Sequence, residues 1–232
     1  MKTKTKAKLL AAGVGLATAS YATYAGVTWC LYGSPKRACR GSGDALLDMF
    51  MPNYEVADRH KITVAAPAEV TLSAAGEIRL ENSAFIRAIF KGRELVLGGE
   101  RNRKIRPNAL LEEVKELGWG VLAELPGREI VMGAITKPWE PNPVFRSLPP
   151  DEFQAFQEPG YVKIIWTLRA NPDGNGQSIF RTETRAVATD VEARRKFRRY
   201  WAFLSPGIIA IRSVMLPAVK AEAERRWLEI AA

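Results

Sequence analysis

The sequence is poor in the residues that most often build metal and redox centres. It has one histidine, His60, and two cysteines, Cys30 and Cys39, which both lie near the N-terminus. The rest of the chain therefore offers no thiol chemistry, no disulfide framework and no zinc site made of cysteine and histidine ligands. We expect no metal and no cofactor.

Several catalytic and nucleotide-binding motifs are also absent. The sequence contains no G-x-S-x-G nucleophile elbow, no P-loop, and no G-x-G-x-x-G after a predicted strand. The function classes that depend on these motifs are therefore excluded. Nothing in the motif content by itself indicates an enzyme.

Acidic residues are missing from the N-terminal segment, because Asp44 is the first of them while seven basic residues precede it. The rest of the chain has 27 basic and 25 acidic residues, so the net charge of +9 belongs mainly to that N-terminal segment. Charge beside an apolar segment indicates membrane topology rather than a nucleic-acid surface. The basic run at residues 194–199 also lacks the exposed aromatic pattern that single-stranded nucleic acid requires, so we predict no nucleic-acid partner.

Residues 9–33 form a run of 25 positions without charge, and about 20 suffice to cross a bilayer as a helix. Trp29 and Tyr32 fall at its end, where aromatic rings favour the headgroup region. We predict a membrane anchor over residues 1–33 that contacts the bilayer through residues 9–33. A signal peptide cleaved after Ala19 or Ala22 is the alternative. Four lysines before the run against three basic residues after it favour, by one charge, a domain outside the cytoplasm.

The last third of the chain has the clearest pattern, after a predicted linker at residues 34–53 and within a domain at 54–232. Residues 161–169 and 177–187 alternate apolar and polar side chains around a turn-rich stretch, which predicts an antiparallel hairpin with one face in the core. Thr189, followed three residues later by Glu192, is typical of a capping box. It predicts a long C-terminal helix, and the apolar faces of hairpin and helix are expected to pack together.

The remaining segments predict further elements around that hairpin and helix. Strands are expected near residues 60–64, 119–125, 128–136 and 144–147, which with the hairpin makes about six. Helices are expected near residues 67–76, 82–92, 108–118 and 149–156. Pro206 lies inside the final helix, and because proline removes a backbone donor and clashes with the preceding turn, we predict a kink there.

This order of elements, with V-A-A-P-A-E-V at residues 64–70 and R-T-E-T-R at residues 181–185, resembles the START/Bet v 1-like superfamily, also called SRPBCC. The chain looks like uncharacterised bacterial members that carry an N-terminal membrane segment. The resemblance implies an α+β helix-grip fold, in which a curved antiparallel sheet surrounds a long C-terminal helix and leaves a cavity. It also implies binding of lipids, sterols or polyketide-like molecules, and cyclase activity in some members. The family generally has seven strands.

Large aromatic residues are the candidates to line a cavity between sheet and helix. They are Trp119, Trp139, Trp166, Phe180 and Trp201. Ordinary core packing is the favoured interpretation for each of these rings, because aromatic residues are common in cores. The alternative is that several of them line an apolar pocket with few polar groups, as small-molecule sites usually have.

Two residues are candidates for proton transfer. His60 shares the parity of Ile62 and Val64 and is expected to point inward, as a hydrogen-bonded core residue or as a general base. Glu183 alternates with Arg181 and Arg185, which predicts a solvent-facing charge ladder. A bulge that reversed this parity would bury Glu183 and make it a candidate acid or base.

The favoured function is a membrane-tethered domain that binds a hydrophobic small molecule or lipid without turning it over. The first alternative is an enzyme of the polyketide cyclase or aromatase type that uses His60 or Glu183. A second is an interaction module whose pocket is filled by its own side chains and which exposes an apolar patch. The basic loop at residues 101–106 is interpreted as a solvated face, with phospholipid headgroups as the alternative contact.

Overall fold

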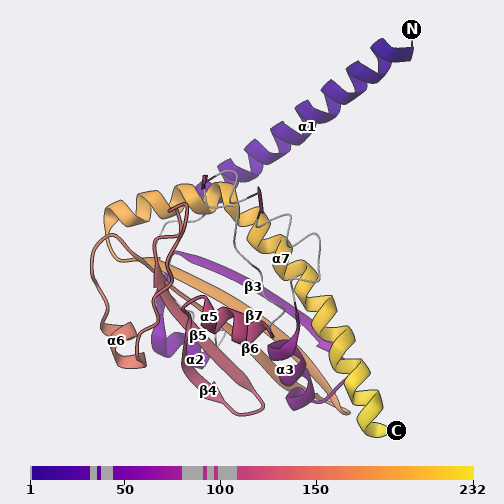
Figure 1. Cartoon of the computed structure of the whole chain (residues 1–232), viewed down its shortest axis with the longest axis vertical. Coiled ribbons are helices and arrows are strands. Elements are labelled where there is room, and N and C mark those ends of the chain that lie inside the picture. The colour runs from indigo at the N-terminus through magenta and orange to yellow at the C-terminus, as the bar shows by residue number, and fades with distance from the viewer. Residues whose placement is uncertain (1, 32–35, 38–43, 80–90, 93–96, 99–108) are drawn as a thin grey trace.

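A five-stranded antiparallel sheet lies between helices on both of its faces, with the long helix α7 crossing one face (Figure 1). The computed structural model describes residues 2–31, 36–37, 44–79, 91–92, 97–98 and 109–232. The helix predicted at residues 82–92 lies mostly outside this range. The basic loop at residues 101–106 and Asn108, the predicted start of the next helix, lie entirely outside it.

The sheet has the strand order β3-β7-β6-β5-β4, and every neighbouring pair is antiparallel. Its strands are β3 (Val56–Val64), β4 (Gly120–Leu125), β5 (Glu129–Thr136), β6 (Val162–Gly174) and β7 (Gln177–Ala188). A separate two-stranded sheet pairs β1 (Lys36–Arg37) with β2 (Asn53–Tyr54). An antiparallel sheet with a long C-terminal helix across it is the helix-grip arrangement, so the predicted α+β fold class is confirmed.

The sheet has five strands rather than about six, because residues 144–147 do not form one. Arg146 makes a single bridge with Ile135, in which each backbone N–H donates to the other residue's carbonyl at 2.9 Å. Pro141 and Pro143 come immediately before this stretch. Since proline has no N–H to donate to a ladder, pairing is limited to one point.

The hairpin of β6 and β7 is longer than the sequence pattern predicts. Its turn is the two residues Asn175 and Gly176, whose φ values are 51° and 74°. Asn-Gly with both residues at positive φ is the preferred two-residue connection, since its twist matches that of the strands. The ladder therefore continues through Pro172 and, after a register shift, to Gly174, both of which lie inside the predicted turn.

Helix α7 spans Val191–Ala231, and its N-cap lies one residue after the predicted cap at Thr189. The N-cap is Asp190, whose Oδ1 accepts from the backbone N–H groups of Glu192 at 2.7 Å and Ala193 at 3.0 Å. Thr189 bonds Tyr161 instead: its Oγ1 donates to the carbonyl of Tyr161 at 3.1 Å and accepts from its N–H. Asp190 rather than Thr189 caps the helix, because its carboxylate also interacts favourably with the positive end of the helix dipole.

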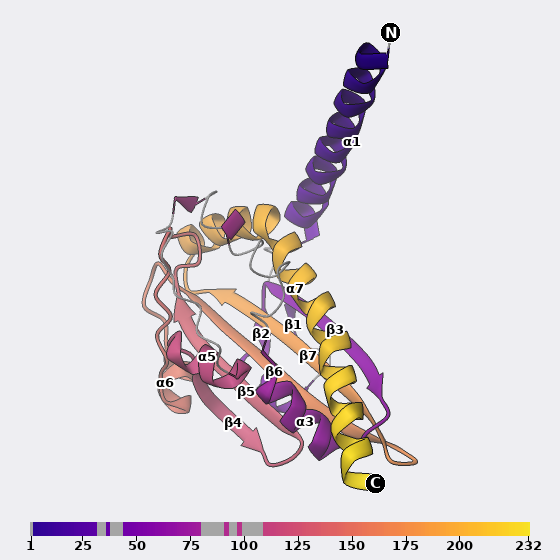
Figure 2. The same ribbon diagram turned by 45° about the vertical axis from the view of Figure 1, so that its right-hand side comes forward.

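Helix α7 is continuous but bent, as Figures 1 and 2 show, and Pro206 lies inside it. The proline leaves the carbonyl four residues earlier without its helical donor, which accounts for the predicted kink. On one side of Pro206, Phe197 and Trp201 are buried against the sheet, and on the other side Met215 and Val219 are buried. The bend therefore lets both halves pack on the same domain.

The face of the sheet that α7 covers also carries α3 (Ala68–Glu77) and, beside it, α5 (Leu110–Glu116). The buried residues of this layer are mostly apolar and come from helices and strands alike. They include Leu72, Met132, Trp166, Leu168, Phe180, Met215 and Val219. This layer is the main core, in which the apolar face of the sheet packs against the apolar side of α7, as the sequence predicts.

The opposite face of the sheet is covered too, by α2 (Ala45–Phe50) and α6 (Pro150–Ala155). Leu47 and Phe50 of α2 pack with Phe153 of α6 and with Ile165 of β6. Helix α2 lies within the predicted linker at residues 34–53. The face expected to be polar and open is therefore a second buried layer.

Helix α1 (Lys2–Leu31) corresponds to the predicted anchor and projects from the domain (Figure 1). Among the described residues, α7 is the helix that is long and apolar enough to cross a membrane, with 28% of its apolar window buried. Helix α7 packs along β3 and α3, so it serves the core of the domain.

Candidate functional site

An open cavity of about 830 Å³ lies along the first half of α7, and its described lining consists of residues of α7 with Leu97 and Trp139, without a residue of the sheet. Its apolar wall includes Trp139, Tyr200 and Leu204, while Arg195 and Arg199 bring positive charge to it. Trp139 lies in the segment after β5, where three prolines prevent regular pairing, so a large ring can face the helix. The cavity thus combines an apolar wall with basic residues, which suits an amphiphilic molecule better than a purely polar one.

Helix α7 continues from this cavity toward Arg212. Tyr200, Leu204, Ile208 and Arg212 follow one another at intervals of four residues, so each is next to the following one on the helix surface. All four are partly buried. At 1.5 Å per residue, Arg212 lies about 12 Å further along the helix than Leu204.

Arg212 is the single charged residue between Arg199 and Lys220, and it turns toward the sheet. Its Nη1 donates to Thr182 Oγ1 at 2.9 Å and its Nη2 to Thr184 Oγ1 at 2.7 Å. Its guanidinium carbon lies 5.4 Å from the centroid of the Trp166 ring. No carboxylate of the described residues lies within ion-pair distance of it. A guanidinium in this environment has a cation–π contact and neutral acceptors, but no counter-ion of its own.

Asp58 and His60 complete a polar group beneath Arg212. In the register of β3 with β7, Asp58 lies opposite Thr184 and His60 opposite Thr182, so all four side chains are on the α7 side of the sheet. Asp58 Oδ1 and His60 Nε2 are hydrogen-bonded at 2.9 Å. The register therefore places an acid, an imidazole and two hydroxyls directly below the guanidinium.

The second oxygen of Asp58 is the unusual atom of this group. Oδ2 is buried, and no described residue donates to it. Burial lowers the pKa of Arg212, and the charge of Asp58 opposes that shift. An unpaired buried carboxylate oxygen costs free energy that a bound donor would recover. The group thus brings a cation and a carboxylate oxygen without a donor to the same side of the sheet.

Glu183 lies on the other side of the sheet, and the prediction that it belongs to a solvent-facing ladder is wrong. It is 9% exposed, and Arg185 beside it is 0% exposed. Arg185 Nε donates to Glu183 Oε1 at 2.6 Å, and Arg185 Nη1 donates to Asp48 Oδ1 on α2 at 2.6 Å. The parity of the strand is as predicted, but α2 covers that face and turns the charges into a buried network. Glu183 is held in ion pairs and is separated from Arg212 by the sheet.

A second pair of carboxylates is buried on that outer side. Glu129 is 3% exposed and lies beside Asp44, the N-cap of α2. Burial and the neighbouring Asp44 raise the pKa of Glu129 to about 8. Arg169 holds both groups, with its Nη1 3.2 Å from Asp44 Oδ2 and its Nε 3.6 Å from Glu129 Oε2. This cluster ties α2 to the sheet, away from the cavity.

The five predicted cavity aromatics fall into two groups. Trp119, Trp166 and Phe180 belong to the main core, where the rings of Trp119 and Trp166 meet edge to face at 6.3 Å between centroids. Trp139 and Trp201 belong to the cluster under the first half of α7, and Trp139 lines the cavity. Trp166 lies beneath Arg212, and Trp139 lines the cavity further along the helix. Phe180 is fully buried and serves packing.

Sequence reasoning identified His60 on the inner face but missed Arg212 and Asp58. A signal for Arg212 was present, since a lone arginine in an otherwise uncharged stretch of helix is unusual in a core. Asp58 shares the parity of His60, so the pattern that turned His60 inward applies to it as well. No group of three or more metal-ligating side chains occurs within the described part of the chain.

No protein-family model matches this chain, and no curated protein matches it. Among solved structures it is similar to a hypothetical protein from Helicobacter pylori, at 6% identity and a TM-score of 0.39, over 81% of this chain and 99% of that one. It is also similar to the ZhuI aromatase/cyclase from Streptomyces sp. R1128, at 14% identity and a TM-score of 0.26, over 74% of this chain and 94% of that one. Neither likeness assigns a function, so we derive one from the residues of this chain.

Proposed function

We propose that this protein is a membrane-tethered domain that binds a hydrophobic small molecule or lipid bearing one polar oxygen group. The apolar part of the ligand occupies the cavity beside Trp139, Tyr200 and Leu204. The polar group lies at Arg212, where it accepts from the guanidinium and donates to Asp58 Oδ2. A hydroxyl or a protonated carboxyl meets both requirements, because each can accept and donate.

The observation that carries this proposal is the lone guanidinium of Arg212 above a buried carboxylate oxygen without a donor. A domain selected for stability alone would gain by replacing such a cation with an apolar residue of similar volume. An interior residue that lowers the stability of the fold is typical of a binding site. The adjacent cavity supplies the apolar volume that a ligand of this class needs.

The membrane part of the proposal rests on α1. Its uncharged run is long enough to span a bilayer, and side chains such as Leu16 are exposed along it, at 72% for that residue. A solvent-exposed apolar helix of this kind requires a partner, and a bilayer fits its length. Tethering would keep the cavity close to a source of hydrophobic ligands.

Native mass spectrometry of the full chain in nanodiscs, followed by extraction and analysis of co-purifying molecules, tests the proposal. We expect one amphiphile per chain, and an Arg212→Met variant that loses it. The control is Arg226→Gln, on the same helix but paired with Glu77 and Glu222, which should keep the ligand.

Thermal unfolding of the ligand-free proteins separates binding from structure. If Arg212 serves the ligand, Arg212→Met should be at least as stable as the wild type, since a partly buried cation without an ion pair is removed. A variant that keeps its amphiphile but unfolds at lower temperature would show that Arg212 only anchors the helix. Recovery of no ligand from the wild type would also refute the proposal.

A second candidate function is proton transfer by His60, and one observation favours it. The 2.9 Å hydrogen bond to Asp58 fixes the orientation of the imidazole beside a cation that could stabilise a developing oxyanion. If His60 catalyses a reaction, the molecule extracted from a His60→Gln variant should differ in mass from the molecule extracted from the wild type. Identical molecules from both proteins would leave binding as the function.

A further inference from the structure

We infer that the first half of α7 is a second membrane contact, which docks on anionic phospholipid headgroups at the foot of α1. The surface consists of Val191, Arg195, Arg199 and Phe203. The inference rests on the membrane span of α1 in the proposed function. Its residues belong to the cavity wall, but they do not include Arg212, where the polar group of the ligand is proposed to lie.

Helix α1 is attached to this part of α7 over its last turns. Tyr21 donates from its hydroxyl to the carbonyl of Phe203, and the hydroxyls of Tyr24 and Ser205 are hydrogen-bonded at 3.0 Å. Arg198 Nε donates to the carbonyl of Trp29 at 2.8 Å, and its guanidinium carbon lies 4.5 Å from the centroid of the Trp29 ring. These contacts hold the first half of α7 beside the point where α1 leaves the domain.

The length of the uncharged run sets the depth of this contact. About 20 helical residues are needed to cross the hydrocarbon core of about 30 Å. Only 12 residues, 9–20, separate the last lysine of the N-terminus from Tyr21, the first residue of α1 that is bonded to α7. They span about 18 Å. This is less than the hydrocarbon core, so α1 cannot span the membrane unless the first half of α7 is in contact with it.

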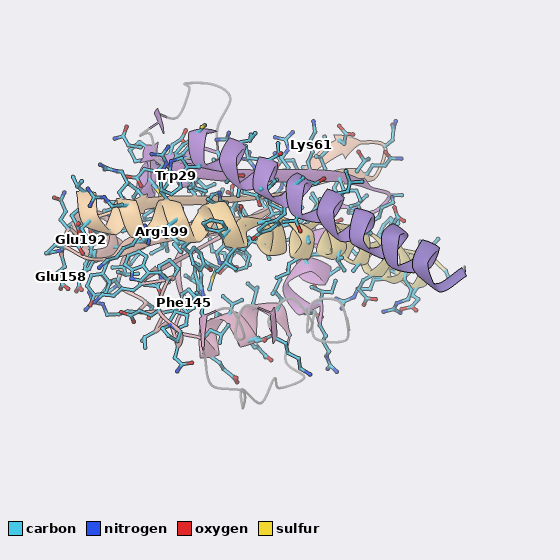
Figure 3. The ribbon with its side chains drawn as sticks, turned by 90° about the horizontal axis from the view of Figure 1, so that it is seen from above. Trp29, Lys61, Phe145, Glu158, Glu192 and Arg199 are labelled. Atoms are coloured by element: carbon cyan, nitrogen blue, oxygen red, sulfur yellow. The ribbon has the colours of Figure 1, made fainter. Side chains whose placement is uncertain are left out.

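The exposed side of α7 at this point has the composition of an interfacial helix. Val191, Arg195, Arg199 and Phe203 recur every four residues and line the same cavity, so two guanidiniums lie between two apolar side chains along the helix. Val191 is 67% exposed and Phe203 50% exposed. Figure 3, seen from the end toward which α1 projects, shows Arg199 on α7 and Trp29 close by.

The charges on this face are available to a partner. Arg194 is paired with Glu55 and Arg198 with α1, but Arg195 and Arg199 have no ion pair with any described residue. Guanidiniums attract phosphate, while the flanking valine and phenylalanine enter the boundary between headgroups and acyl chains. An acidic protein would satisfy the arginines but would leave the apolar residues and the position beside α1 unexplained, so an anionic bilayer is the occupant.

Docking of α7 on the bilayer would also affect how a ligand reaches the cavity. Val191, Arg195, Arg199 and Phe203 also line it, so docking would turn that side of the cavity toward the lipid. A ligand would then pass between bilayer and cavity without crossing bulk water.

The test uses the full chain in nanodiscs of phosphatidylcholine, with or without phosphatidylglycerol. Glu192→Cys, in a background with Cys30→Ser and Cys39→Ser, carries a bimane label next to the docking face. A headgroup spin-labelled lipid quenches the label when α7 is docked. We expect stronger quenching in the anionic discs and its decline with added salt.

The double variant Arg195→Gln/Arg199→Gln should weaken docking by about fivefold for each arginine, the effect of one basic residue near an anionic surface. The control is Arg128→Gln/Arg181→Gln, which removes two exposed charges elsewhere and should leave quenching unchanged. Equal quenching in both kinds of disc, or equal losses in both double variants, would overturn the inference. A chain that did not purify with either disc would refute the span of α1 and the docking together. Extraction of the same samples reports the ligand separately, so a lost docking signal with ligand retained refutes docking alone.

Discussion

Arg185 and Glu183, two residues apart on β7, form a buried ion pair in which Arg185 Nε donates to Glu183 Oε1 at 2.6 Å. The same oxygen is 2.8 Å from Arg59 Nη2. The two arginines differ in burial, since the Arg185 side chain is 0% exposed and that of Arg59 is 51% exposed. One carboxylate oxygen therefore has a buried partner and a solvated one, which can be compared directly.

We predict that Arg185→Ala lowers the free energy of unfolding by about 3–5 kcal/mol, because it leaves Glu183 and Asp48 without their buried partner. Arg59→Ala should cost less than about 1 kcal/mol, since water replaces an exposed partner. Urea unfolding of both variants measures the difference. Similar losses in the two variants would show that burial does not decide the strength of these pairs.

The second prediction concerns pH and the outer cluster at Glu129. Its pKa is about 8 in the folded protein against 4.5 for an ordinary glutamate. Between these values the folded state binds more protons than the unfolded state, so the free energy of unfolding should fall as pH rises from about 4.5 to about 8. The lowered pKa of Asp44 acts in the other direction, and only below its ordinary value of 3.8.

Glu129→Gln should remove most of that dependence, because an amide keeps the hydrogen bonds of the protonated acid and does not ionise. Unfolding curves at pH values across the window, for the variant and for the exposed-site control Glu124→Gln, provide the measurement. A slope that survives in Glu129→Gln would assign the dependence to another group.

The third prediction concerns close packing between β4 and β5. A Cβ added at Gly133 would lie 2.4 Å from Leu122 Cδ1 and 3.2 Å from Phe153 Cε2. Gly133→Ala should therefore destabilise the domain by about 1–3 kcal/mol through overpacking. In a Leu122→Ala background the same change should cost much less, because the overlapping side chain is gone. If Gly133→Ala destabilised both backgrounds equally, the overlap with Leu122 would not be the reason that glycine is required at this position.

Local chemistry in the sequence was enough to predict the hairpin of β6 and β7, the kinked helix α7 and the inward position of His60. Each follows from a periodicity or from a proline whose effect does not depend on distant residues. Errors of one or two residues arose where two local groups competed, as when Asp190 rather than Thr189 capped α7. The predicted strand at residues 144–147 is absent for a related reason, since the neighbouring prolines prevent the pairing that the alternation predicts.

Distant contacts decided the rest. Alternation along β7 showed that Glu183 and Arg185 share a face, but α2, more than a hundred residues earlier in the chain, determined that this face is buried. Likewise, a lone arginine in α7 became part of a site only when the register of β3 with β7 brought Asp58, His60 and two threonines beneath it. A sequence determines which side chains point the same way, because backbone geometry is periodic. What covers them depends on packing between segments far apart in the chain, which no local pattern encodes.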